Sequence, residues 1–135
     1  MPASRFPVSV KGVVFLGPRV VLLRNEREEW ELPGGRLESG EEPASCLARE
    51  VREELGIEVA AEAILDCWRY EIQDKGEVVI VTYGCRAKGE ANLRISAEHQ
   101  ALGMFGVDEL APLRMPEGYK RSIQNWDQLL RERGR

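Results

Sequence analysis

The sequence predicts an α/β fold, with one mixed β-sheet between helices, from three observations. Apolar and β-branched runs indicate strands at residues 8–16 and 20–23, and again at 58–72 and 77–86. Between these two groups lies one long segment with the apolar spacing of an amphipathic helix, and a second such segment closes the chain. Strands on both sides of a central helix, followed by a last helix, favour helices on both faces of a sheet.

Glycine and proline signals divide the first group of strands. Gly17 and Pro18 interrupt the first apolar run, so the first two strands are expected to form a hairpin. Residues 30–32 form a short strand-like piece that the Pro-Gly-Gly sequence at 33–35 stops. Residues 36–42 have no regular apolar period and are expected to form a loop that leads into the central helix.

The central helix is predicted to begin at Pro43 and to end at Gly56. Proline suits a first helical position because its missing N–H has no helical partner there, and glycine suits the residue after a helix. One face of the helix is apolar and is expected in the core; it carries Ala44, Leu47, Ala48, Val51 and Leu55.

The second half of the chain is less regular. Residues 74–76 give a turn between the two later strands, and residues 119–133 give an amphipathic closing helix. The segment 96–110 between them has no clear pattern. We find no repeat or linker, so residues 1–135 are expected to form a single domain.

Composition excludes several classes of protein. No stretch approaches the roughly 18 uncharged apolar residues of a membrane span, and the N-terminus lacks the pattern of a secretory signal. We therefore expect no membrane association and a cytoplasmic location. Cys46, Cys67 and Cys85 are widely spaced, which indicates reduced structural thiols rather than disulfides or a zinc site.

The charge balance bears on ligands. A net charge of -4 and a pI near 5.2 argue against a general binder of RNA or DNA polymers, which needs a surplus of Lys and Arg. A small phosphorylated ligand is compatible with an acidic protein if a divalent cation lies between the two. Such a cation requires clustered carboxylates.

The central helix supplies such a cluster. Glu50, Glu53 and Glu54 share one helix face, near the C-terminal end, where both mutual repulsion and the helix dipole disfavour them. A solvated face partly balanced by Arg49 and Arg52 is one interpretation. The other is a metal site, because Mg²⁺ prefers a few carboxylates, retained waters and substrate phosphate oxygens.

The residues around this cluster reproduce a known motif. The order is Gly35, five residues, Glu41, seven residues, Arg49-Glu50-Val51, one residue, Glu53-Glu54, one residue, Gly56-Ile57. This resembles the Nudix box without a departure, and average composition predicts such a match on the order of 10⁻⁹ per starting point. The segment before the box and Glu38 are also similar to the family, so the resemblance covers residues 8–57 and then weakens.

The resemblance implies a Nudix-type α-β-α sandwich with a mixed β-sheet and a catalytic loop-helix-loop. It implies that Glu50, Glu53 and Glu54, with the backbone carbonyl of Gly34, bind Mg²⁺, with Mn²⁺ as a substitute. It further implies that Arg49 orients a glutamate by ion pairing. Three other residues are expected to shape the box: Gly35, Glu41 and Gly56.

Further site residues follow from the resemblance with less support from the motif. The family's catalytic base is either a box glutamate or one from a later loop, and Glu98 lies about where that later carboxylate falls, as ligand or base. The neighbouring His99 is expected to be a surface or structural residue rather than a base. Arg24 is a candidate for substrate phosphate, and Tyr119 for stacking on a nucleobase.

The implied function is Mg²⁺-dependent hydrolysis of a phosphoanhydride bond in a small nucleoside diphosphate-linked compound. A nucleoside triphosphate or modified nucleotide is the leading substrate class. The alternatives are an ADP-ribose or nucleotide-sugar pyrophosphatase and a non-catalytic nucleotide-binding regulator. The sequence lacks the marker residues of several subfamilies, such as the proline that follows the box in many ADP-ribose pyrophosphatases and the tyrosine of the dinucleoside-polyphosphate group. It also leaves open whether the chain is a monomer or a homodimer.

Overall fold

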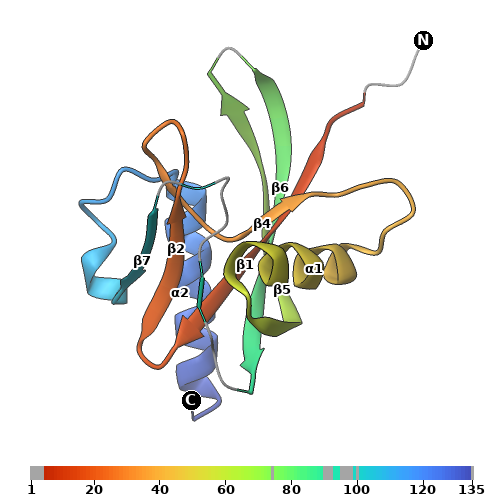
Figure 1. The fold of residues 1–135 in the computed structure, drawn as a ribbon. Helices are drawn as coiled ribbons and strands as arrows, with labels where there is room; N and C mark the ends of the chain where they lie inside the picture. The colour runs from red at the N-terminus through yellow and green to blue at the C-terminus, as the bar shows by residue number, and fades with distance from the viewer. Residues whose placement is uncertain (1–4, 74, 90–92, 95–98, 100, 135) are drawn as a thin grey trace.

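The structure is a computed structural model that describes residues 5–73, 75–89, 93–94, 99 and 101–134, in which the elements form three layers. A mixed sheet lies in the middle, with one long helix on each side (Figure 1). The predicted α/β sandwich is therefore confirmed. None of the helices among these residues is long and apolar enough to cross a membrane.

The first strands bring a short glycine-containing strand next to the start of the chain. The four strands are β1 (Val8–Leu16), β2 (Arg19–Arg24), β3 (Trp30–Glu31) and β4 (Gly34–Arg36). β1 pairs with β2 near their connecting turn but with β4 at its other end, from Ser9 to Lys11. β1 and β2 therefore diverge, and β3 and β4 lie on the two sides of the resulting gap.

The later strands complete the sheet. They are β5 (Glu58–Ile72), β6 (Gly76–Lys88) and β7 (Ala101–Phe105), followed by the 3-10 helix η1 (Val107–Glu109). β5 and β6 form a long antiparallel hairpin, and β6 runs parallel to β1, which makes the sheet mixed. β7 pairs with β2, so the strand order is β3-β2-β1-β6-β5 with β4 on β1 and β7 on β2.

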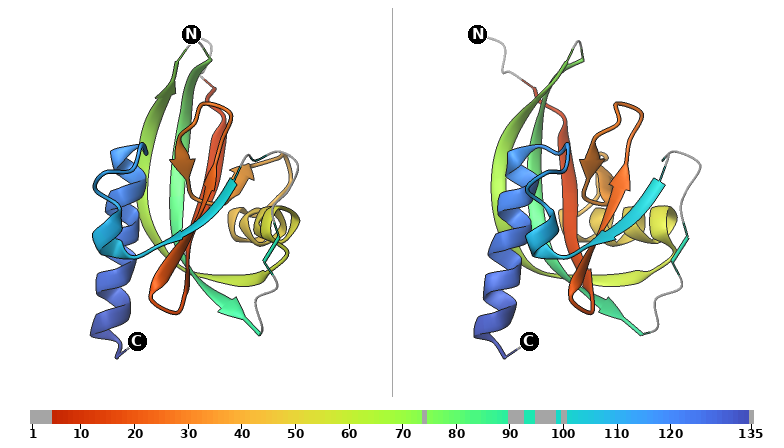
Figure 2. Two further views of the ribbon diagram at one scale, coloured as in Figure 1. Left: turned by 60° about the vertical axis from the view of Figure 1, so that its left-hand side comes forward. Right: turned by 90° about the vertical axis from the view of Figure 1, so that its left-hand side faces the viewer.

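The two helices cover opposite faces of the sheet, as Figure 2 shows. They are α1 (Pro43–Leu55) and α2 (Glu117–Glu132). The alternation of side chains along β2 divides the core between them. Val20 and Leu22 belong to the cluster that contains α2 residues, whereas Val21 and Leu23 belong to the cluster that contains α1 residues.

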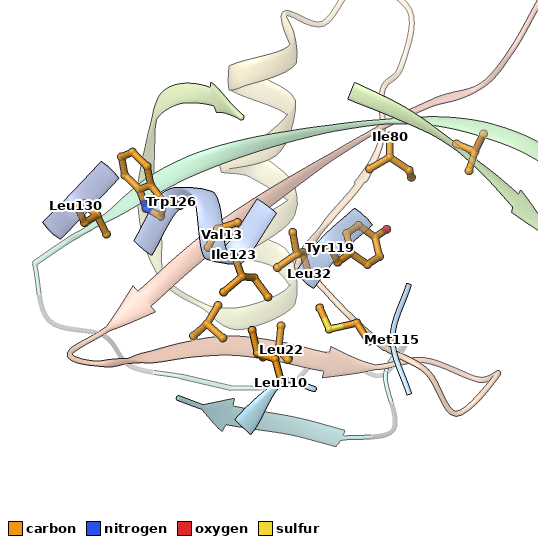
Figure 3. Close-up of a cluster of buried hydrophobic side chains, with 12 residues drawn as sticks. Val13, Leu22, Leu32, Ile80, Leu110, Met115, Tyr119, Ile123, Trp126 and Leu130 are labelled. Carbon is orange, nitrogen blue, oxygen red and sulfur yellow. The ribbon is translucent and has the colours of Figure 1, made fainter. Parts of the chain in front are cut away.

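Each face has its own core. On the α2 side, Ile123 and Trp126 of the helix belong to one cluster with strand residues such as Leu22 and Ile80 (Figure 3). On the α1 side, Leu47 and its neighbours along the helix pack against β1 and β2. The side of α1 that carries Glu50 and Glu54 adjoins β4, which places these acidic residues beside the gap in the sheet.

The structure agrees with the predicted strands and helices and adds two strands. The central helix ends as predicted, with Gly56 in the left-handed conformation at φ 73°. β4 was expected as part of a loop, because its two glycines give no strand pattern; it forms through pairing with β1. β7 lies in the segment whose pattern was unclear, and it forms through pairing with β2.

Candidate active site

Glu54 is held against β4 by a backbone hydrogen bond. The N–H of Gly34 donates to Oε1 of Glu54 at 2.8 Å, and the side chain of Glu54 is buried. Gly34 has φ 143°, and a Cβ there would lie 2.0 Å from the carbonyl oxygen of Val10. Only glycine fits this position, so the strand can approach both β1 and the helix closely.

Gly35 makes room for a second glutamate of the helix. A Cβ at Gly35 would lie 2.4 Å from the carboxyl carbon of Glu50 and 2.5 Å from one of its oxygens. The carboxylate of Glu50 therefore lies directly on the backbone of β4. The adjacent glycines of the Pro-Gly-Gly sequence thus serve two different glutamates, Glu54 and Glu50.

Arg49 organises the outer part of the site, which we call the rim cluster: Glu41, Arg49, Glu50 and Glu53. The guanidinium of Arg49 donates to both carboxylate oxygens of Glu41, at 2.8 and 3.0 Å. Its Nη1 also lies 3.2 Å from carboxylate oxygens of Glu50 and of Glu53. The hydrogen bonds from Arg49 lower the pKa of Glu41 to about 2.

A second cluster lies deeper, and we call it the floor cluster: Lys11, Asn25, Glu31, Glu54 and His99. Nε2 of His99 lies 3.1 Å from Oε1 of Glu31 and 3.3 Å from Oε2 of Glu54. Asn25 donates to Oε2 of Glu31 at 3.0 Å, and Nζ of Lys11 lies 3.8 Å from Oε1 of Glu31. The cluster joins β1, the residue that follows β2, β3, α1 and residue 99.

The two glutamates of the floor cluster have pKa values shifted in opposite directions: that of Glu54 is raised and that of Glu31 is lowered. Burial raises the pKa of Glu54 to about 7, although Lys11, the Gly34 N–H and His99 act against it. Burial also opposes ionisation of Glu31, but Lys11, His99 and Asn25 outweigh it and lower its pKa to about 2. The hydrogen bond to Glu31 raises the pKa of His99. Glu31 is therefore the firmly ionised member of the pair.

The two clusters share a pocket of about 670 Å³, a size suited to a small-molecule ligand. Its lining is unusually acidic for a site that would bind phosphates, with two arginines and one histidine against six glutamates: Glu26, Glu31, Glu38, Glu50, Glu53 and Glu54. A polyanion would be repelled from this lining unless cations lay between them.

The donor set fits Mg²⁺ in a particular way. Among the residues that the structure describes, no group of three or more His, Cys, Asp or Glu side chains is placed to hold a metal ion by itself. The pocket nevertheless offers hard carboxylate oxygens from one helix face and the backbone of β4 beside them. This suits an ion that keeps several waters and shares substrate phosphates, rather than one enclosed by protein.

Most of the predicted site residues come together. Gly34, Gly35, Arg49, Glu50, Glu53 and Glu54 all line the pocket. Glu41 holds Arg49 from the loop before the helix, and Gly56 ends the helix, as the motif implied. Glu98 lies outside the described residues, so its role as ligand or base stays a prediction.

The structure does not bring Arg24 and Tyr119 into the pocket. By the alternation along β2, Arg24 shares the face of Val20 and Leu22, which α2 covers, and it does not line the pocket. Tyr119 is 3% exposed and packs edge-on against Trp68 in the α2-side core. A nucleobase could stack on Tyr119 only by displacing core side chains, so packing explains this residue.

The floor cluster contains the functional candidates that sequence reasoning missed. His99 was expected to be a surface or structural residue, yet it bridges Glu31 and Glu54 in the pocket. Lys11, Asn25 and Glu31 were not singled out at all. A signal existed for Lys11, because a lysine within an apolar strand is unusual and a buried one needs a partner.

Comparison with known proteins shows the family. The family model of the NUDIX domain matches residues 5–126. A MutT-like protein of Streptomyces ambofaciens is 38% identical over 83% of this chain and 71% of its own length. The putative 8-oxo-dGTP diphosphatase 2 of Mycobacterium tuberculosis is 35% identical over 76% of this chain and 75% of its own length. The asymmetrical bis(5'-nucleosyl)-tetraphosphatase of Rattus norvegicus is 31% identical over 75% of this chain and 71% of its own length.

Solved structures share the fold. The MutT protein from Methanosarcina mazei Go1 has a TM-score of 0.80 over 96% of this chain and 99% of its own, at 21% identity. An ADP-ribose pyrophosphatase from Streptococcus suis has a TM-score of 0.66 over 94% and 91%, at 24% identity. Family model, relatives and fold agree with the intact motif at residues 35–57: the chain belongs to the Nudix family of hydrolases, which act on nucleotide-linked compounds.

Proposed function

We propose that the protein hydrolyses a phosphoanhydride bond of a nucleoside triphosphate or modified nucleotide, with Mg²⁺ as cofactor. One observation carries the proposal: Glu50, Glu53 and Glu54 meet the glycine backbone of β4 in one acidic pocket. An excess of carboxylates in a site that receives phosphates has a physical use only when divalent cations are bound there.

In this proposal Glu50, Glu53 and Glu54, with the carbonyl of Gly34, bind the cation. When bound there, Mg²⁺ would supply positive charge for the phosphate oxygens and for a water molecule. The water forms a bond to one phosphorus as the bridging P–O bond breaks, and the other phosphate group leaves. Arg49 pairs with Glu41, Glu50 and Glu53 and so offsets the repulsion among these carboxylates. The proton of the attacking water passes to a carboxylate, either Glu98 or a glutamate of the helix.

The names of the relatives support the substrate class. Two of them act on nucleotides that carry polyphosphate chains, an oxidised deoxynucleoside triphosphate and a dinucleoside tetraphosphate. The 31% identity to the rat enzyme makes a dinucleoside polyphosphate a second candidate. ADP-ribose and nucleotide sugars remain a third, weaker alternative, because only fold likeness below 25% identity supports it.

The experiment is an assay of phosphate and pyrophosphate release from nucleoside triphosphates, 8-oxo-dGTP, dinucleoside tetraphosphates, ADP-ribose and nucleotide sugars. Each is measured with Mg²⁺, with Mn²⁺ and with chelator. We expect metal-dependent hydrolysis that is fastest on a triphosphate or modified nucleotide. Preference for a dinucleotide would move the assignment to the second candidate. Nucleotide binding without hydrolysis in any metal would overturn the proposal in favour of a regulator.

A further inference from the structure

Both oxygens of the Glu54 carboxylate have a polar neighbour in the protein. Oε1 accepts the Gly34 N–H at 2.8 Å, and Oε2 lies 3.3 Å from Nε2 of His99. Each carboxylate oxygen has two lone pairs, so both retain capacity for a cation. The two contacts are on opposite oxygens, so the Gly34 N–H and the His99 imidazole both restrict the orientation of the carboxylate.

The position of His99 depends on Glu31. Nε2 of His99 is hydrogen-bonded to Glu31, and an ionised carboxylate only accepts, so Nε2 carries a hydrogen. Its shorter contact, 3.1 Å, is to Oε1 of Glu31. Glu31 and His99 are 68 residues apart in the sequence, and this contact ties residue 99 to β3.

Glu31 is itself held rigidly. Asn25 donates to its Oε2 at 3.0 Å, and the Lys11 ammonium lies 3.8 Å from its Oε1. Asn25 is buried, and its own Oδ1 accepts the N–H groups of Arg27 and Glu29, which leaves its side chain one orientation. The chain of contacts therefore runs from the buried side chains of Lys11 and Asn25, through Glu31 and His99, to Glu54.

We propose that Glu31 is a positioning residue, which acts through His99 to orient the Glu54 carboxylate for a divalent cation. The inference rests on the proposed function, because it takes Glu54 as a cation ligand. Groups that hydrogen-bond to metal ligands typically change metal affinity or activity by roughly 10–100-fold when they are mutated. Glu31 reaches Glu54 through the imidazole of His99.

The test is a titration of metal-free protein with Mn²⁺, in which free Mn²⁺ is followed by electron paramagnetic resonance without substrate. Glu31→Gln keeps the shape of the side chain but removes its charge. We expect it to weaken Mn²⁺ binding by roughly 10–100-fold. The matched control is Glu29→Gln, since the Glu29 carboxylate accepts hydrogen bonds from Tyr70 and Arg27. We expect this variant to bind Mn²⁺ within about twofold of wild type.

Two further variants separate positioning from folding. Glu31→Asp retains the charge beside Lys11 but withdraws the carboxylate from His99, so we expect a folded protein with weakened Mn²⁺ binding. If Glu31 acts through His99, the double variant Glu31→Gln/His99→Gln loses no more affinity than the weaker-binding single variant. At saturating metal, we expect the Glu31 variants to hydrolyse substrate with a lower kcat and an unchanged KM.

Each outcome decides something. Wild-type Mn²⁺ affinity in Glu31→Gln and Glu31→Asp, or additive losses in the double variant, would overturn the positioning role. Glu54→Gln separates this failure from failure of the proposed function. If Glu54→Gln binds Mn²⁺ as wild type does, the metal assignment itself is wrong. If Glu54→Gln binds weakly while both Glu31 variants bind normally, only the positioning inference is wrong.

Discussion

The rim and the floor of the pocket hold glutamates of the same helix by different physical means. At the rim, one guanidinium, that of Arg49, is shared among Glu41, Glu50 and Glu53, and the Glu53 side chain is 57% exposed. At the floor, the Glu54 side chain is 5% exposed and is held by a backbone N–H and by His99. Glu53 and Glu54 are neighbours in the sequence but have opposite environments.

The difference indicates a division of labour. An ion pair with an exposed partner is weak and screened by salt, so Glu53 can exchange its contact with Arg49 for a contact with a cation at little cost. A buried polar network is costly to break and keeps its geometry. The floor therefore provides a fixed carboxylate, and the rim provides carboxylates that adapt to the ligand.

The largest expected effect is on turnover in Glu53→Gln and Glu54→Gln. If both carboxylates bind the catalytic cation, each loss removes several kcal/mol of transition-state stabilisation, so kcat falls by about 100-fold or more. Steady-state hydrolysis at saturating Mg²⁺ measures this, with the thermal unfolding curve as the control for folding. Wild-type kcat in both variants would refute the metal assignment.

The next effect concerns stability at the floor. Lys11→Met leaves the Glu31 carboxylate buried without its ammonium partner, so we expect a loss of about 3 kcal/mol in the free energy of unfolding. Urea unfolding measures it. Removing both charges in Lys11→Met/Glu31→Gln is expected to restore most of the loss, and a loss equal to the sum of the single variants would contradict the pairing.

The matched control for Lys11→Met is Arg52→Met, at the exposed side of the same site region. Arg52 lies 3.6 Å from Glu58, and both side chains are more than half exposed. We expect a change within about 0.5 kcal/mol, because exposed ion pairs contribute little. A comparable loss in both variants would remove the distinction between buried and exposed pairs on which the comparison rests.

A smaller effect is expected when the rim loses its close contact with β4. In Gly35→Ala, the new Cβ would overlap the Glu50 carboxylate, which must then move away from the strand. We expect kcat to fall by roughly 10–100-fold, as for other displaced groups around a metal site. The measurement includes the Glu50→Ala background, where the overlap is absent and Gly35→Ala should cause no further loss. An equal loss in both backgrounds would place its cause elsewhere.

The rim was largely predictable from the sequence, and the floor was not. The rim is local, since Glu41, Arg49, Glu50 and Glu53 lie within one loop and one helix whose spacing fixes their neighbours. The floor depends on the contact between Glu31 and His99, which only the tertiary fold creates. Arg24 was a candidate for substrate phosphate but does not line the pocket. The alternation of side chains along a strand divides the residues between two faces, but the sequence does not say which of these faces α1 covers.

The last and smallest effect concerns the Glu41–Arg49 pair. Its hydrogen bonds hold the pKa of Glu41 at about 2, below the ordinary value of 4.5. A lowered carboxyl pKa stabilises the folded state above the unfolded pKa, and that contribution is lost as the pH falls through the folded pKa. The difference in melting temperature between wild type and Glu41→Gln should therefore be constant from pH 8 to about 4.5 and shrink towards pH 2.

Salt separates this pair from the floor. The Glu41–Arg49 pair is partly exposed, so the melting-temperature difference for Glu41→Gln at pH 7 should decrease in 1 M NaCl, where the Debye length is about 3 Å. The loss caused by Lys11→Met should persist at the same salt, because buried pairs are screened much less. If salt changed the stability losses of both variants equally, the rim and the floor would not differ in the way the structure indicates. One electrostatic environment would then surround Glu50, Glu53 and Glu54.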